Sequence, residues 1–381
     1  MTPLKLACNN CHEEVVKFFL RRKNCTRVEV IQSLELLGAS FANHPEHHNT
    51  LKAYCYMWAA MKERFSDLSN IVHKLSRPPL RVYEYRIECE DPNELLAIKN
   101  NKYLIQVEGL IIRERILRLN GKSLAAHVRF RAACLAQQQL YRESERLWKH
   151  ALDLEEKHSP IISEDLLRIA QLLINMLHVR LNPVFSQVKE LFNLCLSEES
   201  DYVQEGSETE DDQEKMRTSY LLDKNLNTSL YFLYVLMQMD LTLEEEEECQ
   251  KLVKKFANLD LRTSQGSTPL HIAANDKSTA EDKVVKEMCR FPSVEIIRLL
   301  VESGASVNAQ DNKGNTPLHI ALLLTENRPD ILSVQYDIVR ELVEAGTDLN
   351  ITNNENYKAC DIFKVEGLKR LVSSLTDDIE I

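Results

Sequence analysis

Apolar residues recur every three or four positions along most of this chain. Four segments show the spacing most clearly: 51–65, 127–154, 165–181 and 226–239. This period matches one face of a helix, so these segments are predicted to form amphipathic helices. Nine glycines and eleven prolines are few for 381 residues, whereas strands joined by tight turns use both freely. The pattern therefore predicts an all-α fold.

A four-residue motif recurs at the starts of predicted helices. It reads TPLK at Thr2, Pro3 and Leu4, and TPLH both at Thr268, Pro269, Leu270 and His271 and at Thr316, Pro317, Leu318 and His319. Apolar helices that end in Gly-Ala-Ser (Gly304) and Gly-Thr-Asp (Gly346) follow the second and third copies. This is the ankyrin pattern, in which T-P-L-H opens the first helix of each repeat.

The spacing of these ankyrin motifs exceeds the usual period. Thr268 and Thr316 are 48 residues apart, and Gly304 and Gly346 are 42 apart, whereas ankyrin repeats span about 33 residues. The excess falls in residues 275–293 and 322–336. We therefore expect an extended loop between the two helices of each late repeat.

The stretch CNNCH at residues 8–12 matches the C-x-x-C-H pattern of haem attachment, and C-x-x-C also opens many zinc sites. A zinc site would need a second ligand pair at a defined spacing, and the chain has no second C-x-x-C. Alignment with the later repeats puts Cys8 on a first helix and Cys11 in the turn that follows. The stretch is therefore interpreted as a repeat turn, and His44, His47 and His48 as a solvated loop. No metal, cofactor or catalytic site is predicted.

The middle of the chain has a different repeat. Ser144, Trp148 and Ala151 lie at i, i+4 and i+7 and follow the small pair at 132–133. This spacing is typical of tetratricopeptide repeats, in which a small residue accepts a bulky one from the neighbouring helix. Leu37 and Gly38 give a weaker copy.

Between the helices, residues 198–214 hold nine acidic residues in seventeen and no basic residue, which predicts a solvated, disordered linker. The predicted organisation is an all-α helical-repeat solenoid. Its parts are an incomplete ankyrin repeat (1–24), tetratricopeptide-like helices (25–197), the acidic linker (198–215), further helices (216–259), ankyrin repeats with two extended loops (260–375) and a tail (376–381).

Charge and composition narrow the class of function. The formal net charge is −11, which disfavours nucleic acid or an anionic membrane as the main partner. The longest apolar run, 230–237, is too short to cross a bilayer. Ten cysteines on a chain without a recognisable secretion signal indicate reduced thiols and a cytoplasmic or nuclear location. No phosphate loop, nucleophile elbow or metalloprotease motif is present, so the chain is predicted not to be an enzyme.

Several longer strings resemble the Fem (feminization) family, closest to its B type. They include SLELLGASFAN (33–43), EGLIIRERIL (108–117), RLWKHALDL (146–154) and LVEAGTDLNITN (342–353). The resemblance implies a non-catalytic substrate receptor of a cullin–RING ubiquitin ligase. In that family the receptor reads C-terminal degrons of its substrates and binds elongin B/C and the cullin through a VHL-type box.

The chain departs from the family pattern at both ends. It begins inside an ankyrin repeat, so no degron-binding residue is assigned, and a VHL-type box has no counterpart before Ile381. Leu368, Leu371 and Leu375 have the leucine spacing of an elongin contact, but the closing ankyrin helix is favoured for them. The alternative function is an interaction scaffold without a ligase role.

Overall fold

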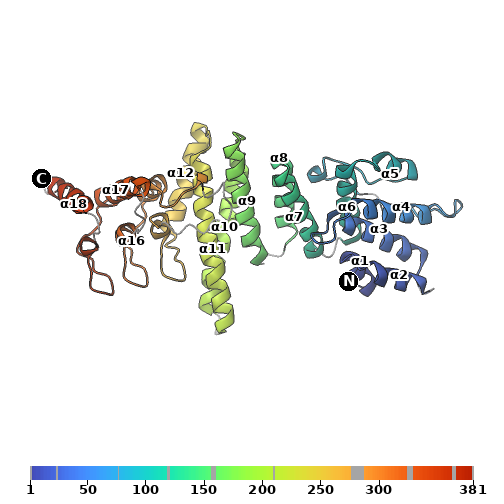
Figure 1. Cartoon of the computed structure of the whole chain (residues 1–381), viewed down its shortest axis with the longest axis horizontal. Coiled ribbons are helices and arrows are strands. Elements are labelled where there is room, and N and C mark those ends of the chain that lie inside the picture. The colour runs from blue at the N-terminus through green and yellow to red at the C-terminus, as the bar shows by residue number, and fades with distance from the viewer. Residues whose placement is uncertain are drawn as a thin grey trace. The chain divides into compact units, whose positions relative to one another are not determined.

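The computed structural model divides into two compact units, residues 1–159 and 160–381 (Figure 1). The boundary falls inside region 25–197, which the sequence pattern predicts to be one set of tetratricopeptide-like helices. The structure describes all residues except 1, 23–24, 76, 118–120, 156–159, 209–210, 276–286, 324–328, 363–365 and 380–381, and leaves out the side chains of 121–122, 160, 205–208, 329–331, 366, 373 and 375–379.

Both units are built from helices, as predicted. The first unit contains α1 (Pro3–Asn9), α2 (Glu13–Arg21), α3 (Arg27–Asn43), α4 (Thr50–Arg64), η1 (Arg81–Tyr83), α5 (Pro92–Ile98), α6 (Lys102–Leu117), α7 (Gly121–Gln137) and α8 (Tyr141–Asp153). The second contains α9 (Pro160–His178), α10 (Phe185–Glu208), α11 (Asp212–Met237), α12 (Leu243–Asn258), α13 (Pro269–Ala273), α15 (Val294–Glu302), α16 (Pro317–Leu322), α17 (Pro329–Glu344), η2 (Ala359–Asp361) and α18 (Glu366–Ile379).

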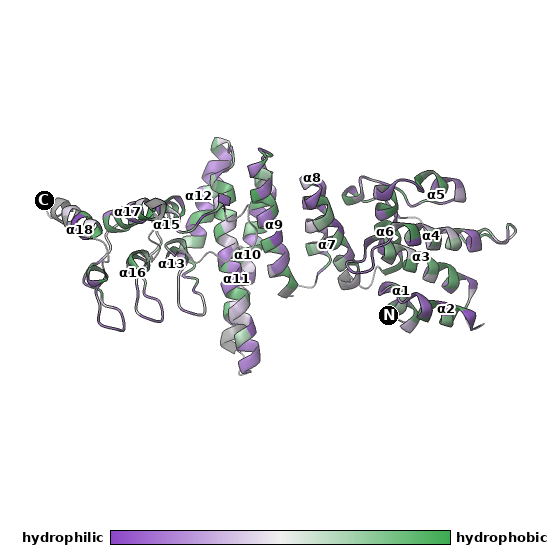
Figure 2. Cartoon of the chain, viewed as in Figure 1, coloured by the Kyte–Doolittle hydropathy of each residue, from purple (hydrophilic) through white to green (hydrophobic). Residues whose placement is uncertain are grey.

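Each labelled helix carries both hydrophobic and hydrophilic residues (Figure 2), which is expected of helices with one buried side. Within the described residues the only β pairing is an isolated bridge between Thr352 and Lys358. None of the described helices combines the length and apolar character that a membrane span requires.

CNNCH joins α1 to α2. The side chain of Thr2 accepts a hydrogen bond from the Lys5 N–H and so caps α1. Cys8 is fully buried on that helix, and Cys11 follows with a positive φ of 57° in the tight turn. Burial raises the pKa of the Cys8 thiol to about 12, which keeps it protonated and unreactive. The stretch is the repeat turn that the sequence predicted.

Close helix contacts organise the first unit. At Gly38 on α3, a Cβ atom would lie 2.8 Å from the Ala53 carbonyl oxygen on α4. At Gly109 on α6, it would lie 2.7 Å from the Ala42 Cβ on α3. Real side chains do not approach so closely, so both glycines permit backbone-to-backbone packing of α3 with its neighbours.

The pair α7 and α8 packs around small residues. Ala151 is fully buried, and Trp148 is almost fully buried. The Ser144 hydroxyl, also buried, donates to the Ala132 carbonyl oxygen at 2.8 Å. These contacts fit the predicted spacing, although assignment to the tetratricopeptide class stays a prediction.

The acidic segment is not a disordered linker over residues 198–208, as the sequence had predicted. It continues α10 to Glu208, and α11 begins at Asp212. Residues 209–210 lie outside the described part. The helix persists because Leu196, Glu199 and Tyr202 face inward and are buried against neighbouring helices. Acidic composition alone did not reveal this buried side.

Glu199 yields a prediction of pH dependence. Its Oε1 accepts a hydrogen bond from the Ser229 hydroxyl at 2.6 Å, while Oε2 has no described partner. Burial raises its pKa from 4.5 to about 8. The protonated acid is therefore favoured by folding, and its stabilising contribution, complete below about pH 4.5, is lost as the pH rises towards 8. We expect the wild type to lose stability relative to Glu199→Gln over this range, by up to about 1.4 kcal/mol per pH unit. Urea unfolding followed by circular dichroism at several pH values would measure this, and parallel pH profiles for the two proteins would contradict it.

The ankyrin block, from α13 to α18, forms the C-terminal part of the second unit. Its first helices are α13 and α16, and α15 and α17 are the second helices that follow them. Most of the first predicted extended loop (276–286) and part of the second (324–328) lie outside the described residues. Beyond them α17 begins at Pro329, so the second loop is shorter than predicted. The predicted tail is also shorter, because α18 continues to Ile379.

Candidate protein-binding groove

Three hairpin loops project from the ankyrin block (Figure 1). Each is closed by one backbone hydrogen bond at the equivalent position. Thr263 N–H donates to the Ser267 carbonyl oxygen, Asp311 N–H to Asn315, and Asn353 N–H to Tyr357, all at 2.9 Å. The tips at 263–267, 311–315 and 353–357 are therefore structural equivalents.

Neighbouring hairpins are joined through their backbones. The Asn312 N–H donates to the Gln265 carbonyl oxygen, and the Asn354 N–H to that of Lys313, both at 2.9 Å. The Asn312 and Asn354 side-chain amides add bonds to the Ser264 and Asn312 carbonyl oxygens at 3.1 and 3.0 Å. These bonds fix the spacing of the three tips.

The two TPLH histidines connect successive repeats. Nδ1 of His271 accepts from the Thr268 N–H at 3.2 Å, which leaves Nε2 to donate to the Asn315 carbonyl oxygen at 2.9 Å. His319 makes the same pair of contacts with Thr316 and with the Tyr357 carbonyl oxygen. Burial lowers the pKa of both imidazoles, so they are neutral under physiological conditions and act as hydrogen-bonding connectors.

Gly314 allows a close approach between hairpins and gives a testable prediction. Its φ is +76°, and an added Cβ would lie 2.7 Å from Oδ1 and 2.8 Å from N of Asn354. Gly346 has a φ of +84° with no atom within 4 Å of that position. We expect Gly346→Ala to cost only the left-handed backbone penalty, about 1–2 kcal/mol. Gly314→Ala should cost about 1 kcal/mol more because the hairpins must separate. Urea unfolding of both variants measures the difference, and equal losses would show that the close approach is unimportant.

A groove of about 930 Å³ lies along these hairpin tips and the first helices. Its polar wall is rich in carboxamide side chains, which can both donate and accept hydrogen bonds. They belong to Gln265, Asn275, Asn312, Asn315, Asn353 and Asn354. Asn315 and Asn353 are buried and bond to each other, so the exposed amides are those of Gln265, Asn312 and Asn354. Such groups suit an extended polypeptide, whose backbone offers alternating donors and acceptors.

Apolar side chains complete the groove. Tyr357 is 51% exposed, and Leu323 is 40% exposed, and both line it with Ile320. Exposed aromatic and aliphatic groups beside amides are typical of protein-binding surfaces. Among the described residues no group of three or more His, Cys, Asp or Glu is arranged to hold a metal ion.

None of the motif residues named from the sequence lines this groove. Thr268, Pro269, Leu270, Thr316, Pro317 and Leu318 start its helices, while Gly304 and Gly346, both at positive φ, end the second helices. Sequence reasoning missed the lining residues Asn312, Asn354 and Tyr357. The sequence contains a signal for these residues. DNKGN (311–315) precedes α16 and NNENY (353–357) precedes η2 by the same distance.

The candidate elongin contacts lie elsewhere, on α18. Leu368 is buried and Leu371 is half-buried. The side chain of Leu375 lies outside the described part. Because α18 packs against α17, burial of Leu368 favours the closing ankyrin helix. The elongin contact itself stays a prediction.

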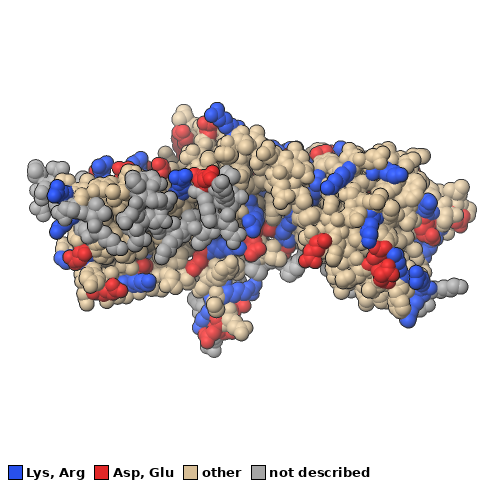
Figure 3. Space-filling model, viewed as in Figure 1, with Lys and Arg blue, Asp and Glu red and all other residues tan. Residues whose placement is uncertain are grey.

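On the face drawn in Figure 3, basic and acidic side chains are interspersed among the described residues. The described Lys and Arg side chains on that face form no broad basic field.

Comparison with known proteins agrees with the fold. Residues 246–353 match the family model of ankyrin repeats in three copies, so the match begins in α12, before the predicted start at 260. Fem-1 homolog C of Bos taurus and of Homo sapiens are each 28% identical over 98% of this chain and 60% of their own length. Fem-1 homolog A of Danio rerio is 28% identical over 97% of this chain and 59% of its own.

The chain thus spans about 60% of the length of the relatives it matches. These relatives are of the C and A types, so the special closeness to the B type stays a prediction. The predicted resemblance to the family itself is confirmed. The chain thus contains ankyrin repeats in its C-terminal part and is similar over nearly its whole length to the fem-1 homologues.

Proposed function

We propose that this protein is a non-catalytic substrate receptor of a cullin–RING ubiquitin ligase and that it holds proteins by their C-terminal degrons. The observation that carries the recognition role is the amide-lined groove of the ankyrin block, with Tyr357 and Leu323 exposed inside it. The resemblance to the Fem family supports the ligase role.

In this proposal the protein forms no covalent bond with its substrate. It raises the local concentration of substrate lysines near a charged ubiquitin-conjugating enzyme, which is an effective-concentration mechanism. Elongin B/C and a cullin are the proposed partners. The proposed compartment is the cytoplasm or the nucleus.

The first test is co-elution of the chain with purified elongin B/C and its cullin. A stable complex is expected, and Leu371→Ser on α18 should weaken it if that helix provides the contact. Leu51→Ser, at a residue that is 71% exposed on α4 in the other unit, serves as the control. Failure of the folded chain to bind would overturn the ligase role and leave the alternative, an interaction scaffold.

The second test concerns substrates. A library of peptides with free C-termini should yield binders that lose affinity when the terminal carboxylate is amidated. The double variant Tyr357→Ser/Leu323→Ser should weaken them if they occupy the groove. Binding that is indifferent to amidation would contradict degron recognition while leaving protein binding in place.

A further inference from the structure

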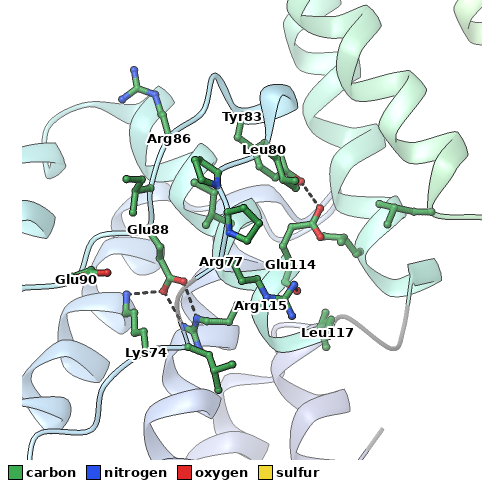
Figure 4. A pocket seen from close by; sticks show the side chains of 17 residues that line it. Lys74, Arg77, Leu80, Tyr83, Arg86, Glu88, Glu90, Glu114, Arg115 and Leu117 are labelled. Carbon is green, nitrogen blue, oxygen red and sulfur yellow. Dashed lines mark hydrogen bonds and ion pairs between the residues drawn. The ribbon is translucent and has the colours of Figure 1, made fainter.

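The first unit contains a separate pocket of about 410 Å³ (Figure 4). It lies between segment 71–91, which belongs to the connection from α4 to α5 and of which residue 76 is not described, and the helices α6, α7 and α8. Nothing in the ankyrin groove contributes to it. We call it the strap pocket, since segment 71–91 forms its outer wall.

A chain of ion pairs between side chains that are at most 11% exposed forms one side of the strap pocket. Lys74 pairs with Glu88 at 2.6 Å, and Glu88 pairs with Arg115 at 2.7 Å. Arg115 also pairs with Glu35 at 2.7 Å. Lys74 further donates to the Cys89 carbonyl oxygen at 2.5 Å. These charges satisfy one another, so they hold the segment in place and are not available to a ligand.

The opposite side is organised by Glu114. Its Oε1 accepts from the Tyr83 hydroxyl at 3.0 Å and lies 2.6 Å from His150 Nε2. Arg77 donates one N–H to the Glu114 backbone carbonyl oxygen at 2.7 Å. Within the described residues Arg77 has no carboxylate within ion-pair distance. Figure 4 places its guanidinium in the middle of the pocket, between Glu114 and Arg115.

The rim of the strap pocket is apolar and open to solvent. Leu75 is 81% exposed, Ile87 is 69% exposed and Leu80 is 38% exposed. All three line the pocket with Pro78 and Pro79. Large apolar side chains gathered at one opening, with a fixed cation below them, are unfavourable in water and mark a binding site.

We infer that the strap pocket binds an extended peptide segment of a partner protein, one that carries an Asp or Glu side chain beside a large apolar residue. The carboxylate pairs with Arg77, which keeps its backbone bond to Glu114, and the apolar residue packs between Leu80 and Ile87. A planar guanidinium with free N–H groups is well suited to bind a carboxylate by two bonds.

Two observations favour a polypeptide with this charge. Leu75 and Ile87 extend beyond the cavity, so a small molecule inside it would leave them exposed, whereas a peptide crossing the opening would cover them. Lys74, Arg86 and Arg115 each pair with a carboxylate, whereas Arg77 has none within ion-pair distance among the described residues. An acidic segment is therefore attracted to Arg77.

A displayed library of random peptides, selected on the full chain, tests this inference. Enriched sequences should hold an internal Asp or Glu within a few positions of Leu, Ile, Phe or Met. A synthetic binder should lose about tenfold in affinity when its acid becomes the amide. Arg77→Gln should remove that difference, and Arg77→Lys should restore part of it. Ile87→Ser should weaken the acidic and amide peptides equally.

Arg81→Gln is the matched control, because Arg81 is an exposed arginine of the same segment that does not line the pocket. It should leave binding unchanged. An acid preference that persists in Arg77→Gln, binders without an acid, or no enriched sequence would each overturn the inference. The assay contains neither elongin nor cullin, so its result is independent of the proposed ligase role.

Discussion

Replacing Arg113 with alanine should destabilise the first unit by about 3 kcal/mol or more. Arg113 is fully buried on α6 and connects three other helices. It donates to the Ser40 hydroxyl on α3 at 2.7 Å, to the Asn9 side chain on α1 at 2.5 Å, and to the Ser123 carbonyl oxygen on α7 at 2.7 Å. Alanine would leave a cavity and three acceptors without this donor.

Among the described residues, only hydrogen bonds to neutral groups stabilise the charge of Arg113. Burial lowers its pKa to about 9, and no salt bridge compensates for it. Arg113→Met keeps most of the volume without the charge, so it should recover part of the loss. Full recovery would show that Arg113 matters for packing and not for the connections among α1, α3 and α7.

Tryptophan fluorescence would isolate this unit during urea unfolding, because the chain has two tryptophans, Trp58 and Trp148, and both lie in it. Arg22→Ala, at the residue that follows α2, is a suitable control, since its guanidinium lies over the Phe18 ring at the surface. That variant should change stability by no more than about 1 kcal/mol.

Glu35→Gln should cost the same unit about 3–5 kcal/mol. Each oxygen of Glu35 pairs with a different guanidinium, Arg64 at 2.5 Å and Arg115 at 2.7 Å, and Glu35 and Arg64 are buried. Removing the shared carboxylate leaves Arg64 as a buried charge with backbone acceptors only. Urea unfolding read by tryptophan fluorescence would give the loss.

Adding Arg64→Met to Glu35→Gln should restore part of that stability, since the unpaired charge is then gone. Glu63→Gln is the control, because Glu63 is 42% exposed and lies 3.8 Å from Arg27, and it should change stability by less than about 1 kcal/mol. If Glu35→Gln and Glu63→Gln proved equally mild, the buried ion pairs would contribute little.

The sequence predicted well the features that are fixed by local pattern. T-P-L-H requires a threonine cap, a proline in the first turn and a histidine that bonds back to the threonine. These three residues therefore located the starts of α13 and α16. Cys11 was placed correctly in a turn because alignment with those repeats left no other position for it.

The features fixed by distant contacts could not be predicted. Segment 71–91 has no apolar period, and its course depends on Lys74 meeting Glu88 and on Arg115 reaching it from α6. Glu199 reads as one of nine acidic residues in a polar stretch, and only the position of Ser229 on the neighbouring helix explains its burial. Asn312 and Tyr357 line one groove only because the hairpins lie side by side, and the local sequence pattern does not show this arrangement.

The backbone bonds between the hairpin tips have a consequence for how this protein can diversify. Main-chain N–H and carbonyl groups supply the connections from Asn312 to Gln265 and from Asn354 to Lys313, and every amino acid except proline carries both groups. Mutations can therefore exchange many outward side chains at the tips while the frame that holds them stays in register. A related gene could acquire a new binding preference there by single substitutions, without first evolving a new scaffold.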